Sequence, residues 1–193
     1  MFARFVLWIL GWKVYGDKPT EPKYVYLAYP HSSNWDGFLL LVFMIAIPLD
    51  LKWMGKSSLM KPPLGWFLTA LGGVGIDRST SNNMVDQMAA RFRDSESFAL
   101  GIPPEGTRGL RDFWKSGFYH IALKADVPVC CGVLDYKRKE GGFGPMVKLT
   151  GNMAEDMERI REIYSEIDPG GFNHEKVGPI RLRKETEEEK LSA

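Results

Sequence analysis

The stretch that decides the fold is Tyr24-Val-Tyr-Leu-Ala-Tyr-Pro30, followed by the polar turn His31-Ser-Ser-Asn34 and an apolar segment from Trp35 to about Ile47. The first part predicts a buried strand, which Pro30 ends. The last part predicts a helix. Its uninterrupted apolar run, Phe38 to Ile47, is much shorter than the ~20 residues that a membrane span needs, so we expect a buried helix.

The same alternation of strands and helices continues along most of the chain. Further strands are predicted at 51–54, 74–77, 97–102, 127–134 and 146–149, the last after a hairpin turn at 138–142, and further helices at 64–71, 82–93, 117–125 and 154–167. Strands that alternate with helices predict an α/β domain. Polar clusters follow several of the strand ends, which is where α/β sheets commonly bind their ligands.

The composition is that of an ordinary globular domain. A chain of 193 residues that is 45% hydrophobic and 25% charged can bury a core without disulfides or a structural metal. The net charge of +1 argues against a general nucleic-acid binder, although residues 1–150 carry a basic excess that suits an anionic membrane or a phosphate. The adjacent Cys130 and Cys131 make no disulfide framework and point to a reducing compartment.

The first 15 residues are apolar and rich in Trp, with Arg4 and Lys13 at the flanks. Gly11-Trp-Lys13 is a poor site for signal-peptide cleavage. On a helix, Trp8 and Trp12 would share a face, and such aromatic rings favour the headgroup level of a bilayer. We interpret residues 1–15 as a membrane-interfacial helix. The alternative is a helix that packs on its own domain or on another subunit.

The first cluster with chemical potential is His31-Ser-Ser-Asn-Trp-Asp36. With His31 in the turn and Asp36 in the first turn of the helix, Asp36 can accept the imidazole Nδ1–H and leave Nε2 free to take a proton. That arrangement is a general base with an orienting acid. The alternative is structural, because Ser33-x-x-Asp36 resembles a capping box and an acid in the first turn suits the helix dipole.

The second cluster is Gly72-Gly-Val-Gly-Ile-Asp-Arg78. Its glycines permit close backbone approach, and Arg78 offers a planar fork of donors to a phosphate or carboxylate. The alternative is a plain turn, with Arg78 paired to Asp77 or Asp112.

The third cluster is Pro103-Pro-Glu-Gly-Thr-Arg-Gly109. Gly106 allows a tight turn, after which Thr107 and Arg108 present a hydroxyl, backbone N–H groups and a guanidinium together, as suits a phosphate monoester. Glu105 could hydrogen-bond a substrate hydroxyl or fix an arginine. A surface turn with a Glu–Arg pair is the alternative.

The fourth cluster is Val127-Pro-Val129, preceded by Phe113-Trp-Lys-Ser-Gly117. An apolar strand entered through a proline is ordinarily part of the core, but it can also form the wall of an acyl tunnel.

The four clusters, in this order, resemble the glycerolipid acyltransferase superfamily. The pattern of His-x4-Asp, a Gly-rich stretch ending in Arg, Pro-Glu-Gly-Thr-Arg and Val-Pro-Val is most similar to bacterial 1-acyl-glycerol-3-phosphate acyltransferases. The resemblance runs from about Tyr24 to Leu134, and Pro104-Glu-Gly-Thr-Arg108 is its most specific piece. It implies a single α/β domain with a central, mostly parallel sheet flanked by helices.

The resemblance also implies roles for individual residues. His31 would be the general base that deprotonates the acceptor hydroxyl, and Asp36 would orient it. Arg78 would contact the acceptor phosphate, and Pro128 would lie near the acyl donor. The acceptor pocket would be built by Glu105, Gly106, Thr107 and Arg108.

The implied reaction moves a fatty acyl group from a thioester, acyl-CoA or acyl carrier protein, to the hydroxyl of a lyso-glycerolipid. The resemblance favours 1-acyl-glycerol-3-phosphate as acceptor, which would give phosphatidic acid. No metal and no cofactor beyond the thioester co-substrate are expected. Two alternatives stay open: another lyso-lipid acceptor, such as an amino-acid-linked one, and a non-catalytic module that binds lipid or anions at a membrane. A phosphate-ester hydrolase lacks an obvious metal cluster or covalent nucleophile.

The expected partners are therefore a membrane lipid acceptor, the thioester donor and the membrane surface, without nucleic acid. We expect a peripheral or monotopic protein at the cytoplasmic face of a membrane. Its parts would be the interfacial segment 1–15, the catalytic domain 16–178 and a charged tail 179–193.

Overall fold

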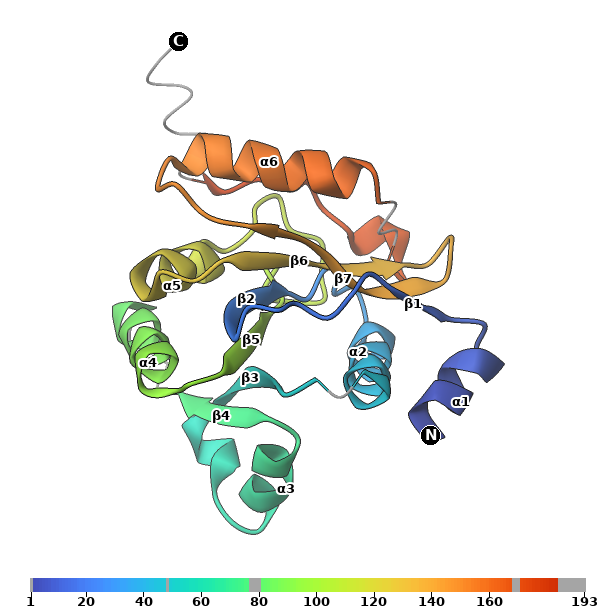
Figure 1. Cartoon of the computed structure of the whole chain (residues 1–193), viewed down its shortest axis with the longest axis horizontal. Helices are drawn as coiled ribbons and strands as arrows, with labels where there is room; N and C mark the ends of the chain where they lie inside the picture. Colours follow the sequence, from blue (N-terminus) through green and yellow to red (C-terminus); the bar gives the residue numbers. More distant parts are fainter. Residues whose placement is uncertain (1, 48, 77–80, 168–170, 184–193) are drawn as a thin grey trace.

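The computed structural model describes residues 2–47, 49–76, 81–167 and 171–183, and the structural statements below concern these residues (Figure 1). Its helices, with two short 3-10 turns, are α1 (Phe2–Ile9), α2 (Asn34–Ala46), η1 (Ser57–Met60), α3 (Leu64–Ala70), α4 (Ser81–Asp94), α5 (Gly117–Ala125), α6 (Met153–Ser165) and η2 (His174–Lys176). Its strands are β1 (Lys13–Tyr15), β2 (Lys23–Leu27), β3 (Leu51–Lys56), β4 (Gly73–Ile76), β5 (Phe98–Ile102), β6 (Val129–Asp135) and β7 (Glu140–Val147).

The described strands form one mostly parallel sheet in the order β1-β7-β6-β2-β5-β3-β4. β2 lies at the centre and pairs in parallel with β5 and β6, while β3 joins β5 to β4 in parallel. β7 is antiparallel to β6 because only a short turn connects them, and parallel strands need a longer crossover. The predicted α/β domain with a mostly parallel sheet is thereby confirmed.

Side chains alternate along each strand, so the two faces of the sheet bury different sets of residues. One face carries Val25 and Leu27 and packs against residues of α4, α5 and α6. The opposite face carries Tyr24 and Tyr26 and packs against residues of α2. α2 in turn packs on α1. The sheet is therefore covered on both faces, with its strand ends left to form a site.

The start of the chain differs from the predicted single helix. α1 ends at Ile9, and β1 then pairs with β7 at the edge of the sheet. Trp8 is 74% exposed, whereas Trp12 is buried and makes edge contacts with the rings of Phe43 and Tyr136. The two Trp side chains therefore do not share a helix face, because the helix stops between them. None of the described helices combines the length and the apolar character that crossing a membrane requires.

β7 begins six residues before its predicted start. The turn lies at residues 136–139, and the glycines that suggested a turn belong to the strand. A Cβ on Gly141 would lie 2.4 Å from a ring carbon of Phe43, and one on Gly142 would lie 2.2 Å from the Tyr15 carbonyl oxygen. These glycines serve close packing of α2 and β1 on β7.

The packed chain extends past the predicted boundary at Gly178. Leu182 is fully buried, and its neighbour Arg181 accepts a backbone hydrogen bond from Trp114. Residues 179–183 are therefore packed against the loop that precedes α5.

Candidate active site

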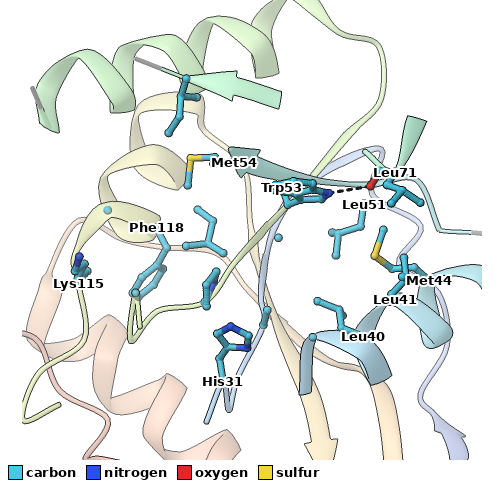
Figure 2. Close-up of a pocket in the computed structure, with 18 of the residues that line it drawn as sticks. His31, Leu40, Leu41, Met44, Leu51, Trp53, Met54, Leu71, Lys115 and Phe118 are labelled. Carbon is cyan, nitrogen blue, oxygen red and sulfur yellow. Dashed lines mark hydrogen bonds between the residues drawn. The ribbon is translucent and has the colours of Figure 1, made fainter. Parts of the chain in front are cut away.

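An apolar pocket of about 710 Å³ lies beside the carboxyl ends of β2 and β5 and extends across β3 to Ile76, at the end of β4 (Figure 2). Its walls come mainly from α2, β3 and α5, and include Leu40, Met44, Leu51, Trp53, Met54 and Phe118. Ala28 and Gly101 also line it, and their lack of bulk leaves space beside the sheet. A pocket of this size, lined by apolar residues with a few polar groups, is typical of small-molecule sites. The pocket lies where the sequence predicts a ligand site, and ligand binding there stays a prediction.

His31 lies on the wall of this pocket, in the turn that follows β2. Its backbone N–H donates a hydrogen bond to Oε1 of Glu105, at 2.9 Å. Burial lowers the pKa of the imidazole below its usual value, Asp36 acts in the opposite direction, and Arg108 lowers it further. A lowered pKa keeps the imidazole neutral at neutral pH, which is the form that can accept a proton.

Asp36 is buried and holds the turn that carries His31. Its Oδ2 accepts the backbone N–H groups of Ser32 and Ser33, at 2.5 and 2.7 Å, together with the Ser32 hydroxyl at 3.0 Å. Its Oδ1 accepts the hydroxyl of Tyr136 and, at 3.4 Å, the amide of Phe172. Asp36 therefore links the turn at the start of α2 to two distant parts of the chain.

The predicted capping box is present. The Ser33 hydroxyl accepts the amides of Trp35 and Asp36, and the Asp36 carboxylate accepts the amide of Ser33. Within the described residues, the His31 side chain is not among the hydrogen-bond partners of this carboxylate. Direct orientation of the imidazole by Asp36 therefore stays a prediction. In the structure Asp36 caps the start of α2, and its charge acts to raise the pKa of His31.

Glu105 is 5% exposed, and burial raises its pKa to about 7 even though the His31 amide acts to lower it. Its second oxygen, Oε2, is buried and has no hydrogen-bond partner among the described residues. A buried polar atom without a partner is costly. Glu105 is not among the residues that line the pocket, although its neighbours Pro103 and Gly106 are.

The turn from Pro103 to Gly109 contains one cation, Arg108, and lies against a second, Lys115. Gly106 adopts φ +65°, which favours glycine, and a Cβ there would lie 2.7 Å from Cδ of Lys115. Lys115 also lines the pocket, to the left of His31 and Phe118 in Figure 2. Arg108 is exposed and donates to Oδ1 of Asn34, in the first turn of α2. The Thr107 hydroxyl accepts the Gly109 amide at 3.4 Å, within the turn itself.

Of the residues singled out in the sequence, Pro128 is not brought to this group. Arg78 lies outside the described residues. Pro128 precedes β6 at the opposite end of the sheet, where its carbonyl accepts the amide of Val25 and it lines a separate hollow. Ala28, the residue that follows β2 and lines the main pocket, lies about 10 Å further along the chain direction than Val25. The structure therefore separates the Val-Pro-Val cluster from the site of His31.

Several contributors to the site were not singled out in the sequence. Tyr136 reaches Asp36 from a position 100 residues away, and Asn34 meets Arg108 across 74 residues. No local pattern marks such pairs. Ser32 lies within the His31-Ser-Ser-Asn-Trp-Asp36 cluster, and its hydroxyl donates to Asp36.

Comparison with known proteins places this geometry in a family. Residues 12–134, which hold His31, Asp36 and the Glu105 turn, match the family model described as Acyltransferase. This chain belongs to the acyltransferase family. The match covers more than half of the chain and contains every described residue that we group around the pocket near His31, apart from Tyr136 and Phe172.

Two curated 1-acyl-sn-glycerol-3-phosphate acyltransferases illustrate the similarity. The protein of Limnanthes douglasii is 31% identical over 133 residues, which cover 64% of this acyltransferase-family chain and 46% of the relative. The protein of Pseudomonas aeruginosa is 28% identical over 141 residues, which cover 66% and 53%. The chain thus spans about half the length of the curated relatives that it matches.

A solved acyltransferase has the same fold. The crystal structure of PlsC, the 1-acyl-sn-glycerophosphate acyltransferase of Thermotoga maritima, aligns with a TM-score of 0.55 over 88% of this chain and 75% of that chain, at 18% identity. This likeness supports the α/β architecture of the acyltransferase family in the present chain.

Proposed function

We propose that this protein transfers a fatty acyl group from a thioester to the hydroxyl of a lyso-glycerolipid, with His31 as general base. The observation that carries the proposal is the position of a neutral imidazole on the wall of an apolar pocket of about 710 Å³. The apolar walls suit an acyl chain, and the cations Lys115 and Arg108 beside the pocket suit an anionic headgroup. Relatives named as 1-acyl-sn-glycerol-3-phosphate acyltransferases support this acceptor and phosphatidic acid as product.

The reaction needs no covalent enzyme intermediate. His31 takes the proton of the acceptor hydroxyl as its oxygen attacks the thioester carbonyl. The carbon–sulfur bond then breaks, and the thiolate receives the proton from the imidazolium, so the base is regenerated. General base catalysis typically contributes about 10²–10⁴-fold, and the remainder comes from holding both substrates in line and stabilising the oxyanion.

Glu105 and Asp36 support the base in different ways. Glu105 accepts the backbone amide of His31 and so fixes the position of this turn. Asp36 fixes the next two residues of the turn through their amides. We infer that both carboxylates position His31, in addition to any direct contact with substrate.

We also propose that the protein works at a membrane surface. In α1, Phe2 and Trp8 are 80% and 74% exposed, as an interfacial helix requires, while Ala3 and Leu7 pack on α2. An enzyme whose acceptor is a membrane lipid has to meet that acceptor at the bilayer surface, which gives the exposed face of α1 a role.

The test is acyl transfer by the purified chain, followed by thiol release and by mass spectrometry of the lipid product. The variant His31→Ala should lose roughly two to four orders of magnitude in rate and keep its fold by circular dichroism. Both acyl-CoA and acyl carrier protein thioesters are supplied, with acceptors that carry or lack a phosphate. An unchanged rate in His31→Ala rejects the base, and vesicle binding without thioester consumption identifies a binding module instead.

The acceptor assignment has its own test. The variant Arg108→Lys keeps the charge but loses the bidentate fork, so it should weaken a phosphate-bearing acceptor more than a phosphate-free one. Equal losses on both acceptors reject the phosphate contact and favour another lyso-lipid, such as an amino-acid-linked one.

A further inference from the structure

The excursion between β3 and β4, residues 57–71, exposes large apolar side chains. It comprises η1 and α3 and projects from the edge of the sheet in Figure 1. Trp66 is 72% exposed, Phe67 63%, Leu64 53% and Leu59 49%. Single exposed apolar residues are normal, but four within nine residues of one short excursion mark an interaction surface.

The excursion is nevertheless firmly anchored. Met60 fills a slot that three glycines leave open: a Cβ on Gly55, Gly73 or Gly75 would lie 2.1, 3.0 or 3.2 Å from the Met60 side chain. The start of α3 lies equally close, since a Cβ on Gly65 would lie 2.1 Å from the Met60 carbonyl. The exposed rings therefore project from a packed element.

The charged residues within the excursion and the two strands that flank it have one sign. Residues 51–76 contain Lys52, Lys56 and Lys61 and no acidic residue. Lys52 pairs with Asp50, while Lys56 and Lys61 are exposed. Exposed aromatic rings with lysines beside them are the combination that anionic bilayer surfaces attract.

The excursion reaches the pocket at its last residue, Leu71. Trp53 and Leu71 both line the pocket, and the Trp53 indole N–H donates to the Leu71 carbonyl at 2.8 Å (Figure 2). The end of α3 is thus tied directly to the pocket wall. A surface that held Trp66 and Phe67 would lie next to the cavity that we assign to the acyl chain.

We propose that the 57–71 excursion docks on the anionic surface of a phospholipid bilayer, as a contact separate from α1, and so places one side of the pocket against the lipid. The purpose of this contact rests on the proposed function, although the binding itself does not. A second copy of the chain is a poorer occupant, because symmetric pairing of this face would bring its lysines together.

Vesicle binding by the full chain tests the proposal. Phosphatidylcholine vesicles with and without phosphatidylglycerol are sedimented with the parent, with Trp66→Ser/Phe67→Ser and with Lys56→Gln/Lys61→Gln. We expect the Ser pair to bind both vesicle types roughly tenfold more weakly, because buried apolar area contributes to binding on either surface. We expect the Gln pair to lose roughly tenfold on anionic vesicles only, with a weaker dependence on salt.

Two matched controls lie elsewhere on the surface. Leu123→Ser removes an exposed apolar side chain of α5, and Lys148→Gln removes an exposed lysine after β7. Both should bind as the parent does. Parent-like binding by the two test variants overturns the proposal. So does a parent dimer that becomes a monomer in the Ser pair without any loss of vesicle binding.

An activity measurement separates this proposal from the proposed function. With a short-chain thioester and an acceptor dispersed below its aggregation limit, the Ser pair should retain the parent kcat, since Trp66 and Phe67 do not line the pocket. With acceptor in anionic vesicles, its apparent KM should rise roughly tenfold. If the parent transfers no acyl group, the proposed function fails while the vesicle result still decides the docking surface.

Discussion

The backbone amide of His31 is held by the carboxylate of Glu105, at 2.9 Å, and this bond joins the turn after β2 to the turn after β5. The two strands are neighbours in parallel register, so their carboxyl ends meet at the same edge of the sheet. A buried acid thereby sets the position of the proposed base from across a strand pair.

The titration of Glu105 should be visible in stability. Its folded pKa of about 7 exceeds the value for an unfolded chain, so the folded state binds more protons between pH 4.5 and 7 and stability falls as the pH rises through that window. The loss is up to about 3 kcal/mol. Urea unfolding at pH 5 and pH 8 should show a steeper fall for the parent than for Glu105→Gln.

His31 contributes to the same pH range with opposite sign, because its lowered folded pKa makes stability rise with pH up to about 6.5. This contribution is common to both proteins and cancels in the comparison. The variant Glu162→Gln removes an exposed carboxyl of α6 and should follow the parent. Parallel pH dependences for the parent and Glu105→Gln would contradict the assignment.

The pH profile of activity should respond to Arg108. Its charge lowers the pKa of His31, so Arg108→Gln should move the acid limb of kcat/KM to higher pH. The profile is measured from pH 5 to 8 with a phosphate-free acceptor, which keeps loss of acceptor binding out of the comparison. The variant Arg91→Gln, at an exposed position of α4, is the control. A shift toward lower pH refutes the interaction.

The bond from Tyr136 to Asp36 should matter for both stability and rate. Removing the hydroxyl in Tyr136→Phe leaves Oδ1 of a buried carboxylate with only the long contact from Phe172, and we expect a loss of about 1.5–3 kcal/mol. Urea unfolding measures the loss, with Tyr15→Phe, at an exposed tyrosine of β1, as the control. Equal stability of the two variants would show that this bond contributes nothing.

Acyl-chain preference should follow the volume of the pocket. Met44 lines the pocket, whereas the next residue, Ile45, is 63% exposed. We expect Met44→Trp to favour shorter thioesters and Ile45→Trp to leave the preference unchanged, by comparison of kcat/KM along a series of acyl lengths. An identical length profile in both variants would place the chain elsewhere.

Local patterns predicted most of the elements and the place of the site. α5 has the predicted bounds, Gly117–Ala125, and the capping box at Ser33 follows from a four-residue pattern. Contacts across long separations could not be predicted. Trp12 looks like an interfacial residue in sequence, yet it is buried because α1 ends before it and β1 turns the chain onto α2.

The role of the glycines could not be predicted either, because it also depends on contacts across the fold. Gly73 and Gly75 suggested a backbone that approaches a phosphate, and in the structure they make room for Met60. A glycine allows another group to approach the backbone closely, but the sequence does not show which group, because the tertiary fold sets its neighbours. Tyr136 illustrates the converse, since a tyrosine at the end of β6 carries no sign that its hydroxyl reaches Asp36.

The pairing of β1 with β7 has a mechanical consequence. Three register pairs and the bond from the Lys13 amide to the Lys139 carbonyl join the chain after α1 to the sheet edge, and Arg4 bonds the Ala46 carbonyl. α1 therefore cannot swivel independently of the domain. The surface on which α1 docks therefore also sets the orientation of the whole molecule. A force applied to α1 is transmitted to the sheet as shear along its edge strand, β1.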